Sequence, residues 1–332
     1  MTKDYFVAMT ECHMFDNSAM AEIAYYPGMK SWMDSIDGIM RAWWGKGGRE
    51  DTGGDSEIDV HQFPGASELV ANMDKYNVDV AFCLRESMMD ASGQVRPMST
   101  NAYILSQIAP YSDRLYLEAN VGPMIKRGMK HVLWELEYLV KERGAKLCKV
   151  YQPEDDGPIN DKRLWPFYEK AQELGVPLTV HTGVSYLNQP NSSCKTTQLD
   201  DVMLDFPGLR VIAYHAGWPD TEELCNLCGK HPNLYMSLSG VISYYSRSPY
   251  RGYHAIGTAM QWMAPDKIVL GHDAMGTELG RQVDYIRNLQ MPEELQVNWG
   301  YRQLTEEDKA KILGLNLAKL TGIEPTKRAK KG

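Results

Sequence analysis

The sequence predicts one α/β domain over residues 1–332, built as a (β/α)8 barrel (TIM barrel). Short apolar runs alternate with helical patterns eight times along the chain. Most of these runs are apolar almost throughout, as expected of strands that are covered on both faces. A doubly wound open sheet is the alternative fold. The runs predicted as strands are 5–13, 78–84, 115–121, 145–151, 177–183, 210–217, 234–240 and 267–273.

The segments between the strands carry apolar residues at helical spacing. Residues 67–77 and 129–144 show this pattern, and the second segment ends in a basic turn and Gly144, which together are a helix-stop signal. Residues 163–175 and 220–232 repeat the scheme. The sequence therefore predicts helices where a barrel needs them.

Two segments fall outside this repeat. Residues 14–67 form a long insertion after the first strand, rich in Met and Trp and then in Gly. Long loops after barrel strands usually cap or line the site, although a surface loop is the alternative for the Gly-rich part. Residues 304–323 predict an amphipathic C-terminal helix, with Thr305 as its cap and Gly322 as its stop. We expect this helix to pack outside the barrel.

Composition narrows the class of protein. The formal charge of −8 gives no general attraction to nucleic acid or anionic membranes. No apolar run is long enough to span a bilayer, and the N-terminus lacks the pattern of a secretory signal. The six scattered cysteines indicate reduced thiols. We therefore expect a cytoplasmic protein that acts on a small molecule.

Five polar side chains stand at the predicted carboxyl ends of strands. Glu11 and His13 end the first strand, His181 the fifth, His215 the sixth and Asp273 the eighth. Enzymes with this fold carry their chemistry at these ends. An isolated buried histidine is usually a satisfied core residue, but several with two carboxylates need a partner, which a divalent cation supplies. Zinc, manganese and iron all suit such a set.

The alternation of side chains along a strand supports a chelating pair. Residues i and i+2 point to the same face, so Glu11 and His13 can both face the barrel axis.

Several segments in a fixed order carry a resemblance to a known family. The chain resembles the amidohydrolase superfamily, in particular the amidohydrolase-related branch that contains metal-dependent aromatic-acid decarboxylases. The resemblance covers nearly the whole chain and implies a homo-oligomer. It rests on "ECH" (11–13), "LVANMDKYNVDVAF" (69–82), "LTVHTG" (178–183), "VIAYHAGWP" (211–219), "KIVLGHD" (267–273) and "ILGLNLAKLTGI" (312–323).

The resemblance also implies roles for the five polar residues. Glu11, His13, His181 and Asp273 would bind one metal ion, and His215 would stand beside it as a catalytic residue. In many members the first strand ends in His-x-His, whereas a decarboxylase subgroup has Glu-x-His. Glu11 therefore favours decarboxylation over hydrolysis.

Further residues are candidates for substrate binding. Arg85 and Glu86 follow the second strand. They form a surface ion pair, or Arg85 clamps a substrate carboxylate, or Glu86 is an extra metal ligand. Lys149 on the fourth strand is the candidate for the carbamylated lysine of dinuclear members, but a structural or substrate-binding role is preferred. His61 in the insertion would approach the pocket, and Trp218 would suit a flat substrate.

The leading functional hypothesis is non-oxidative decarboxylation of a hydroxylated aromatic or related unsaturated acid. Asp273, which the resemblance favours, or His215 would protonate the ring carbon. The first alternative is a hydrolase of an amide, lactone or C–C bond that uses a metal-bound water. The second is an iron or manganese oxygenase with a further metal at Glu86, His61 or Lys149. The last is a non-catalytic subunit that keeps a structural metal.

Overall fold

The computed structural model describes residues 4–23, 25–26, 29, 64–89, 93–155, 157–185, 190–273 and 279–330. Most of the predicted insertion 14–67 lies outside these residues. Its described part includes α1 (Asn17–Ile23), and α3 (Ala66–Tyr76) follows it. No described helix is both long and apolar enough to cross a membrane.

Eight parallel strands form the core of the fold. They are neighbours in chain order, and all eight predicted strands are confirmed. Nearly all residues of these strands are buried, which agrees with the continuous apolar runs of the sequence. The strands are β1 (Ala8–His13), β2 (Val80–Leu84), β5 (Leu115–Asn120), β6 (Leu147–Val150), β7 (Leu178–Val180), β8 (Val211–Ala213), β9 (Leu234–Ser237) and β10 (Ile268–Val269).

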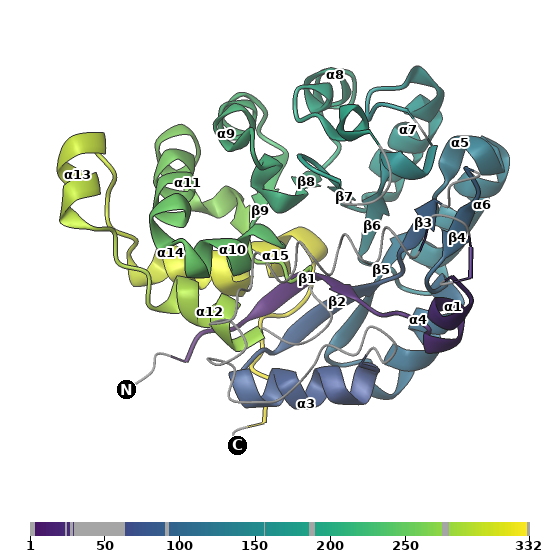
Figure 1. The fold of residues 1–332 in the computed structure, drawn as a ribbon, viewed down its shortest axis with the longest axis horizontal. Coiled ribbons are helices and arrows are strands. Elements are labelled where there is room, and N and C mark those ends of the chain that lie inside the picture. Colours follow the sequence, from purple (N-terminus) through teal and green to yellow (C-terminus); the bar gives the residue numbers. More distant parts are fainter. Residues whose placement is uncertain are drawn as a thin grey trace.

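Helices surround the strands (Figure 1). In α6, for example, Val132, Leu136 and Leu139 are buried, which is one face of a helix turned to the sheet. A short antiparallel hairpin, β3 (Ser87–Met89) and β4 (Val95–Pro97), follows β2. The other helices are α4 (Asn101–Ile108), α5 (Met124–Arg127), α6 (Met129–Lys141), α7 (Trp165–Leu174), α8 (Gln198–Asp205), α9 (Thr221–Lys230), α10 (Val241–Arg247), α11 (Pro249–Trp262), α12 (Leu279–Arg287) and α13 (Glu293–Trp299), with short 3-10 turns at η1 (Ala109–Tyr111), η2 (Gln152–Asp155), η3 (Lys162–Leu164), η4 (Asn191–Cys194), η5 (Tyr214–Gly217) and η6 (Pro265–Lys267).

The barrel closes where β1 meets the chain that follows β10. The bridge pairs Thr10 with Gly271, His272 N donates to Thr10 O at 2.8 Å, and Asp273 N donates to Glu11 O at 2.9 Å. We call this contact the seam. It joins the carboxyl ends of the two strands, so it brings two predicted site residues, Glu11 and Asp273, together through their backbones.

The C-terminal helix also forms a hydrogen bond to Leu270, the residue that follows β10. It consists of α14 (Glu306–Ala310), a π-helical turn (Lys311–Leu315) and α15 (Asn316–Thr321). Leu270 N donates to Ile312 O at 3.1 Å instead of to β1. The predicted cap at Thr305 and stop at Gly322 are both confirmed.

The position of this helix corrects the expectation that it packs outside the barrel. Leu317, Leu320 and Ile323 share one buried cluster with barrel residues that include Phe6 and Phe82. The helix therefore closes the amino-terminal mouth of the barrel, opposite the predicted site. Its apolar pattern indicated that one face is buried but not which surface covers that face.

Candidate active site

The end of β1 departs from regular strand geometry. The pairing with β2 shifts register between Met9 and Cys12, and Glu11 adopts a left-handed backbone conformation with φ 58°. Such bulges are frequent next to active sites, where they re-aim a side chain. The bulge, and not the simple alternation of side chains along a strand, directs the fully buried Glu11 and the nearby His13 toward the other predicted site residues.

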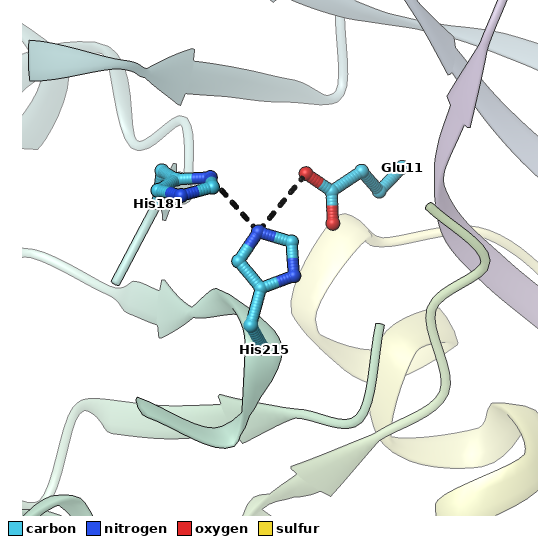
Figure 2. Close-up of side chains that lie close together, drawn as sticks. All are labelled: Glu11, His181 and His215. Carbon is cyan, nitrogen blue, oxygen red and sulfur yellow. Dashed lines mark hydrogen bonds and ion pairs between the residues drawn. The ribbon is translucent and has the colours of Figure 1, made fainter. Parts of the chain in front are cut away.

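All five predicted residues lie in one cluster at the carboxyl ends of the strands. Glu11 Oε1 is 3.8 Å from His215 Nε2 and 3.9 Å from His13 Nε2. His13 Nε2 is 3.1 Å from Asp273 Oδ1. Figure 2 shows that Glu11 and His181 both approach His215, whose Nε2 is 2.8 Å from His181 Nδ1. The cluster contains two potential ligand groups: Glu11, His181 and His215, and Glu11, His13 and Asp273.

Lys149 and Glu86 border this cluster. Lys149 Nζ donates to Glu11 Oε1 and lies 3.6 Å from Glu86 Oε2. Glu86 Oε2 is in turn 3.9 Å from His13 Nδ1. Both side chains are largely buried, so a surface ion pair does not describe Glu86. Their position beside the cluster is compatible with the predicted site roles.

Arg85 points to a different place. Its Nε donates to Asn120 O at 2.9 Å and its guanidinium to Asn120 Oδ1 at 3.2 Å, with further contacts to Ser87 and Gly122. Arg85 is buried, which corrects the surface ion-pair alternative. These contacts tie the guanidinium to the end of β5, to Gly122 after it and to Ser87. Because its donors are directed at protein acceptors, the role of Arg85 as a clamp for a substrate carboxylate loses its support.

The remaining candidates lie at the margin or outside the described residues. Trp218 follows the turn that carries His215, and its ring meets Tyr244 edge-on at 6.1 Å between centroids. His61 falls outside the described residues. His272, next to Asp273 in sequence, turns away, because its Nδ1 contacts Gln282 Oε1 at 2.7 Å.

The histidine pair shows a specific electrostatic problem. His215 Nδ1 lies 3.1 Å from Ser239 O and His181 Nε2 lies 3.2 Å from Val184 O. A carbonyl oxygen only accepts, so both of these nitrogens carry the hydrogen. In neutral rings the other two nitrogens then present lone pairs to each other at 2.8 Å. A positive centre between or beside them removes this repulsion.

Burial sets the charge state of the cluster. It lowers the pKa of His13 to about 4 and also lowers the pKa of His181 and His215, so these rings are neutral at pH 7. Burial raises the pKa of Glu11 to about 7 against the opposing effect of Lys149, and it raises the pKa of Asp273. Neutral imidazole is the form that binds metals.

These observations fit a divalent cation. Glu11 Oε2 and His13 Nδ1 are buried without a hydrogen-bond partner among the residues that the structure describes. Three carboxylates, those of Glu11, Glu86 and Asp273, surround the ammonium group of Lys149. A cation would balance this negative charge and accept the lone pairs of the imidazole nitrogens. The donor set of nitrogen and oxygen atoms suits zinc, manganese or iron.

The sequence prediction missed one buried carboxylate below the cluster, Glu118 in the middle of β5. A signal existed in the sequence, because an acidic residue inside the run "LYLEANV" is costly to bury without partners.

Comparison with known proteins gives one family and several similar structures. A family model described as Amidohydrolase matches residues 59–323. A curated relative, 2-keto-4-carboxy-3-hexenedioate hydratase of Sphingobium sp. (strain SYK-6), is 33% identical over 100 residues. That match covers 25% of this chain and only 29% of the relative.

Two solved structures are similar over nearly their whole length. An uncharacterised TIM-barrel protein from Bordetella bronchiseptica has a TM-score of 0.65 at 16% identity, covering 95% of this chain and 98% of that one. The 5-carboxyvanillate decarboxylase of Novosphingobium aromaticivorans, with bound manganese and 3-methoxy-4-hydroxy-5-nitrobenzoic acid, has a TM-score of 0.63 at 14% identity, covering 96% and 97%. At such identities the likeness establishes the barrel fold.

Proposed function

Because the chain belongs to the amidohydrolase family, we propose that it is a metal-dependent lyase. In this proposal it removes the carboxylate of a hydroxylated aromatic or related unsaturated acid as carbon dioxide, without an oxidant. The observation that carries the proposal is the cluster of Glu11, His13, His181, His215 and Asp273 at the carboxyl ends of the strands. The similar decarboxylase fold, solved with a hydroxylated nitrobenzoic acid, supports the substrate class.

Four residues would hold the cation: Glu11, His13, His181 and Asp273. The bound ion would act as a Lewis acid toward the substrate carboxylate and a neighbouring oxygen, which orients the ring. Manganese is favoured because it is the ion of the similar decarboxylase. In this proposal the four ligands bind one ion, and Glu86 beside Lys149 is where a second ion would find a further carboxylate.

Asp273 would supply the proton. Decarboxylation needs a proton at the ring carbon that carries the carboxylate, after which the C–C bond breaks and its electron pair restores the ring. Burial raises the pKa of Asp273 in the metal-free protein. Its two oxygens face different partners, His13 Nε2 at 3.1 Å and His215 Nδ1 at 3.5 Å.

His215 would act as the proton acceptor for the substrate hydroxyl group. The Ser239 carbonyl fixes the hydrogen on Nδ1, so Nε2 is the basic atom and faces the cluster. This tautomer suits an acceptor of the hydroxyl proton better than a donor to the ring carbon. Asp273 and His215 would therefore divide the acid and base roles.

A direct experiment tests this function. The manganese-loaded protein is incubated in D2O with a panel of hydroxybenzoates, and carbon dioxide and the aromatic product are measured. We expect carbon dioxide in equal amount to product, with one deuterium at the carbon that lost the carboxylate. Turnover of an amide or lactone panel, without release of carbon dioxide from any hydroxybenzoate, would favour the hydrolase alternative.

A second candidate is hydration of an unsaturated polycarboxylic acid. The partial match to a hydratase supports it. Adding unsaturated polycarboxylic acids to the substrate panel separates the two reactions, because hydration removes the absorbance of a conjugated double bond and releases no carbon dioxide.

The proposal extends to the cellular setting. The six cysteines of the sequence are all buried and free, which suits the reducing cytoplasm. The proposal retains a homo-oligomer acting on a small molecule, which size measurement in solution would test.

A further inference from the structure

Glu118 is a fully buried carboxylate inside the barrel, below the cluster. Its Oε1 accepts hydrogen bonds from Thr179 Oγ1 and from the Tyr214 hydroxyl, both at 2.6 Å. Its Oε2 accepts from Glu11 N at 3.2 Å. One side chain on β5 therefore connects β7, the turn after β8, and the bulge of β1.

The bond to Glu11 meets a need of the bulge. At the register shift of β1, no strand partner is paired with Glu11 in the ladder to β2. A buried backbone N–H without an acceptor is costly, and Glu118 Oε2 supplies that acceptor. A left-handed non-glycine residue is strained and persists only where its surroundings over-determine it. Among these surroundings, Glu118 is the side chain that accepts the backbone N–H of Glu11.

The same layer also positions the lysine. The Tyr214 ring, whose hydroxyl is bonded to Glu118, lies under Lys149 Nζ at 5.0 Å from the ring centroid. Lys149 donates in turn to Glu11 Oε1. Glu118 thus acts on Glu11 by two routes: directly through the Glu11 backbone, and through Tyr214 and Lys149 to its carboxylate.

We propose that Glu118 is a positioning residue that fixes Glu11 in its left-handed conformation and so sets the metal affinity and coordination of the site. The proposal rests on the proposed function only in that Glu11 binds a metal. Glu118 is separated from the cluster by Glu11 and Tyr214, so it acts through other residues and not by contact with substrate.

The substitution Glu118→Gln separates the two sides of this carboxylate. The amide oxygen still accepts from Thr179 and Tyr214, whereas the amide NH2 group faces Glu11 N–H, which is a donor opposite a donor. We expect the affinity for Co2+ to fall by about 10- to 100-fold, the range for outer-shell partners of metal ligands. The visible absorption spectrum of the bound Co2+ should also change, because Glu11 is displaced.

Thr179→Val is the matched control. It removes one donor to Glu118 Oε1 and keeps the contact with Glu11, so the Co2+ affinity and spectrum should stay close to those of the wild type. If Glu118→Gln does not fold by circular dichroism, Glu118→Asp replaces it, because the shorter carboxylate withdraws from Glu11 N. A folded Glu118 variant with wild-type affinity and spectrum would overturn the inference. Failure of the wild-type protein itself to bind Co2+ would instead overturn the proposed function.

Discussion

Three of the five predicted site residues have left-handed backbones. Glu11, His215 and Asp273 have φ values of 58°, 60° and 51°, and the described chain has only two other non-glycine residues with positive φ, Asn77 and Ala216. Strained backbone concentrates at functional sites, and here it coincides with residues chosen from the sequence for their chemistry. The strain is therefore an independent indication that these positions serve function and not folding alone.

Removing one proposed ligand tests the site at the level of a residue. His181→Ala should lower manganese affinity by more than the about 100-fold seen for outer-shell partners, since it removes a ligand atom. Equilibrium dialysis with metal analysis measures this. His254→Ala is the control, because His254 contacts Tyr301 and Trp299 away from the cluster. Unchanged metal occupancy in His181→Ala would show that the ligand assignment is wrong.

Lys149 gives a prediction about the metal-free protein. Lys149→Met keeps an unbranched side chain that is one atom shorter, and it leaves the buried Glu11 carboxylate without its ammonium partner. Breaking a buried ion pair from one side costs about 3–5 kcal/mol, so the free energy of unfolding without metal should fall by about that amount. Added manganese should recover part of the loss, because the cation takes over the charge. Urea unfolding with and without manganese measures both effects, and equal losses in the two conditions would contradict the prediction.

The sequence predicted the residues of the cluster better than their surroundings. Residue type and position at strand ends were enough to select Glu11, His13, His181, His215 and Asp273, all of which the structure brings together. The bulge at Glu11 was not predictable, because a register shift depends on pairing with β2. The burial of Arg85 was also missed, since its acceptor Asn120 lies at the end of β5, distant in sequence.

At the scale of an element, the end of α3 offers a clean stability test. Asn77 is the C-cap of α3 in a left-handed conformation and is exposed. Asn77→Ala should lower the free energy of unfolding by about 1 kcal/mol, because alanine lacks asparagine's tolerance of this backbone. Asn77→Gly is the control and should not destabilise, since glycine adopts the conformation freely. Urea denaturation distinguishes the two, and an Asn77→Ala protein as stable as the wild type would argue against this cap geometry.

Element boundaries show what local sequence can predict. The helix expected over 67–77 forms as α3, and the capped helix expected over 304–323 forms with both of its signals in place. The π-helical turn in the middle of the latter was not predicted, because nothing in its local pattern departs from helical spacing. It arises where the helix meets β1 and β10.

At the scale of the molecule, the packing of the C-terminal helix against the start of β1 depends on one glycine. A Cβ atom on Gly314 would lie 2.7 Å from Phe6 O and 2.9 Å from Ala8 N. Gly314→Ala should therefore push the C-terminal helix away from β1 and lower the free energy of unfolding by about 1–3 kcal/mol, as overpacking does. Lys319→Ala, on an exposed position of α15, is the control and should change stability by less than about 0.5 kcal/mol. Thermal unfolding of both variants measures the difference, and a neutral Gly314→Ala would mean that the helix can shift without cost.

Metal removal should weaken the seam between β1 and the chain after β10. A cation held by Glu11, His13 and Asp273 would join β1 to the chain after β10, across the closure of the barrel. At a free metal concentration about 100-fold above the dissociation constant, binding adds about 2.7 kcal/mol to stability. Treatment with a chelator should lower the melting temperature, and added manganese should restore it. An identical melting temperature with and without chelator would count against a cation at this position.

The seam also has a consequence for how the protein is made. β1 is translated before the other strands and can pair with β2 early, but its other edge finds its hydrogen-bond partners only in residues 270–273. Because Glu11 and Asp273 meet across that edge, a nascent chain cannot assemble the five-residue cluster until residue 273 has been translated. Nascent chains that stop short of this segment would therefore expose one unpaired strand edge, which makes them ready targets for chaperones.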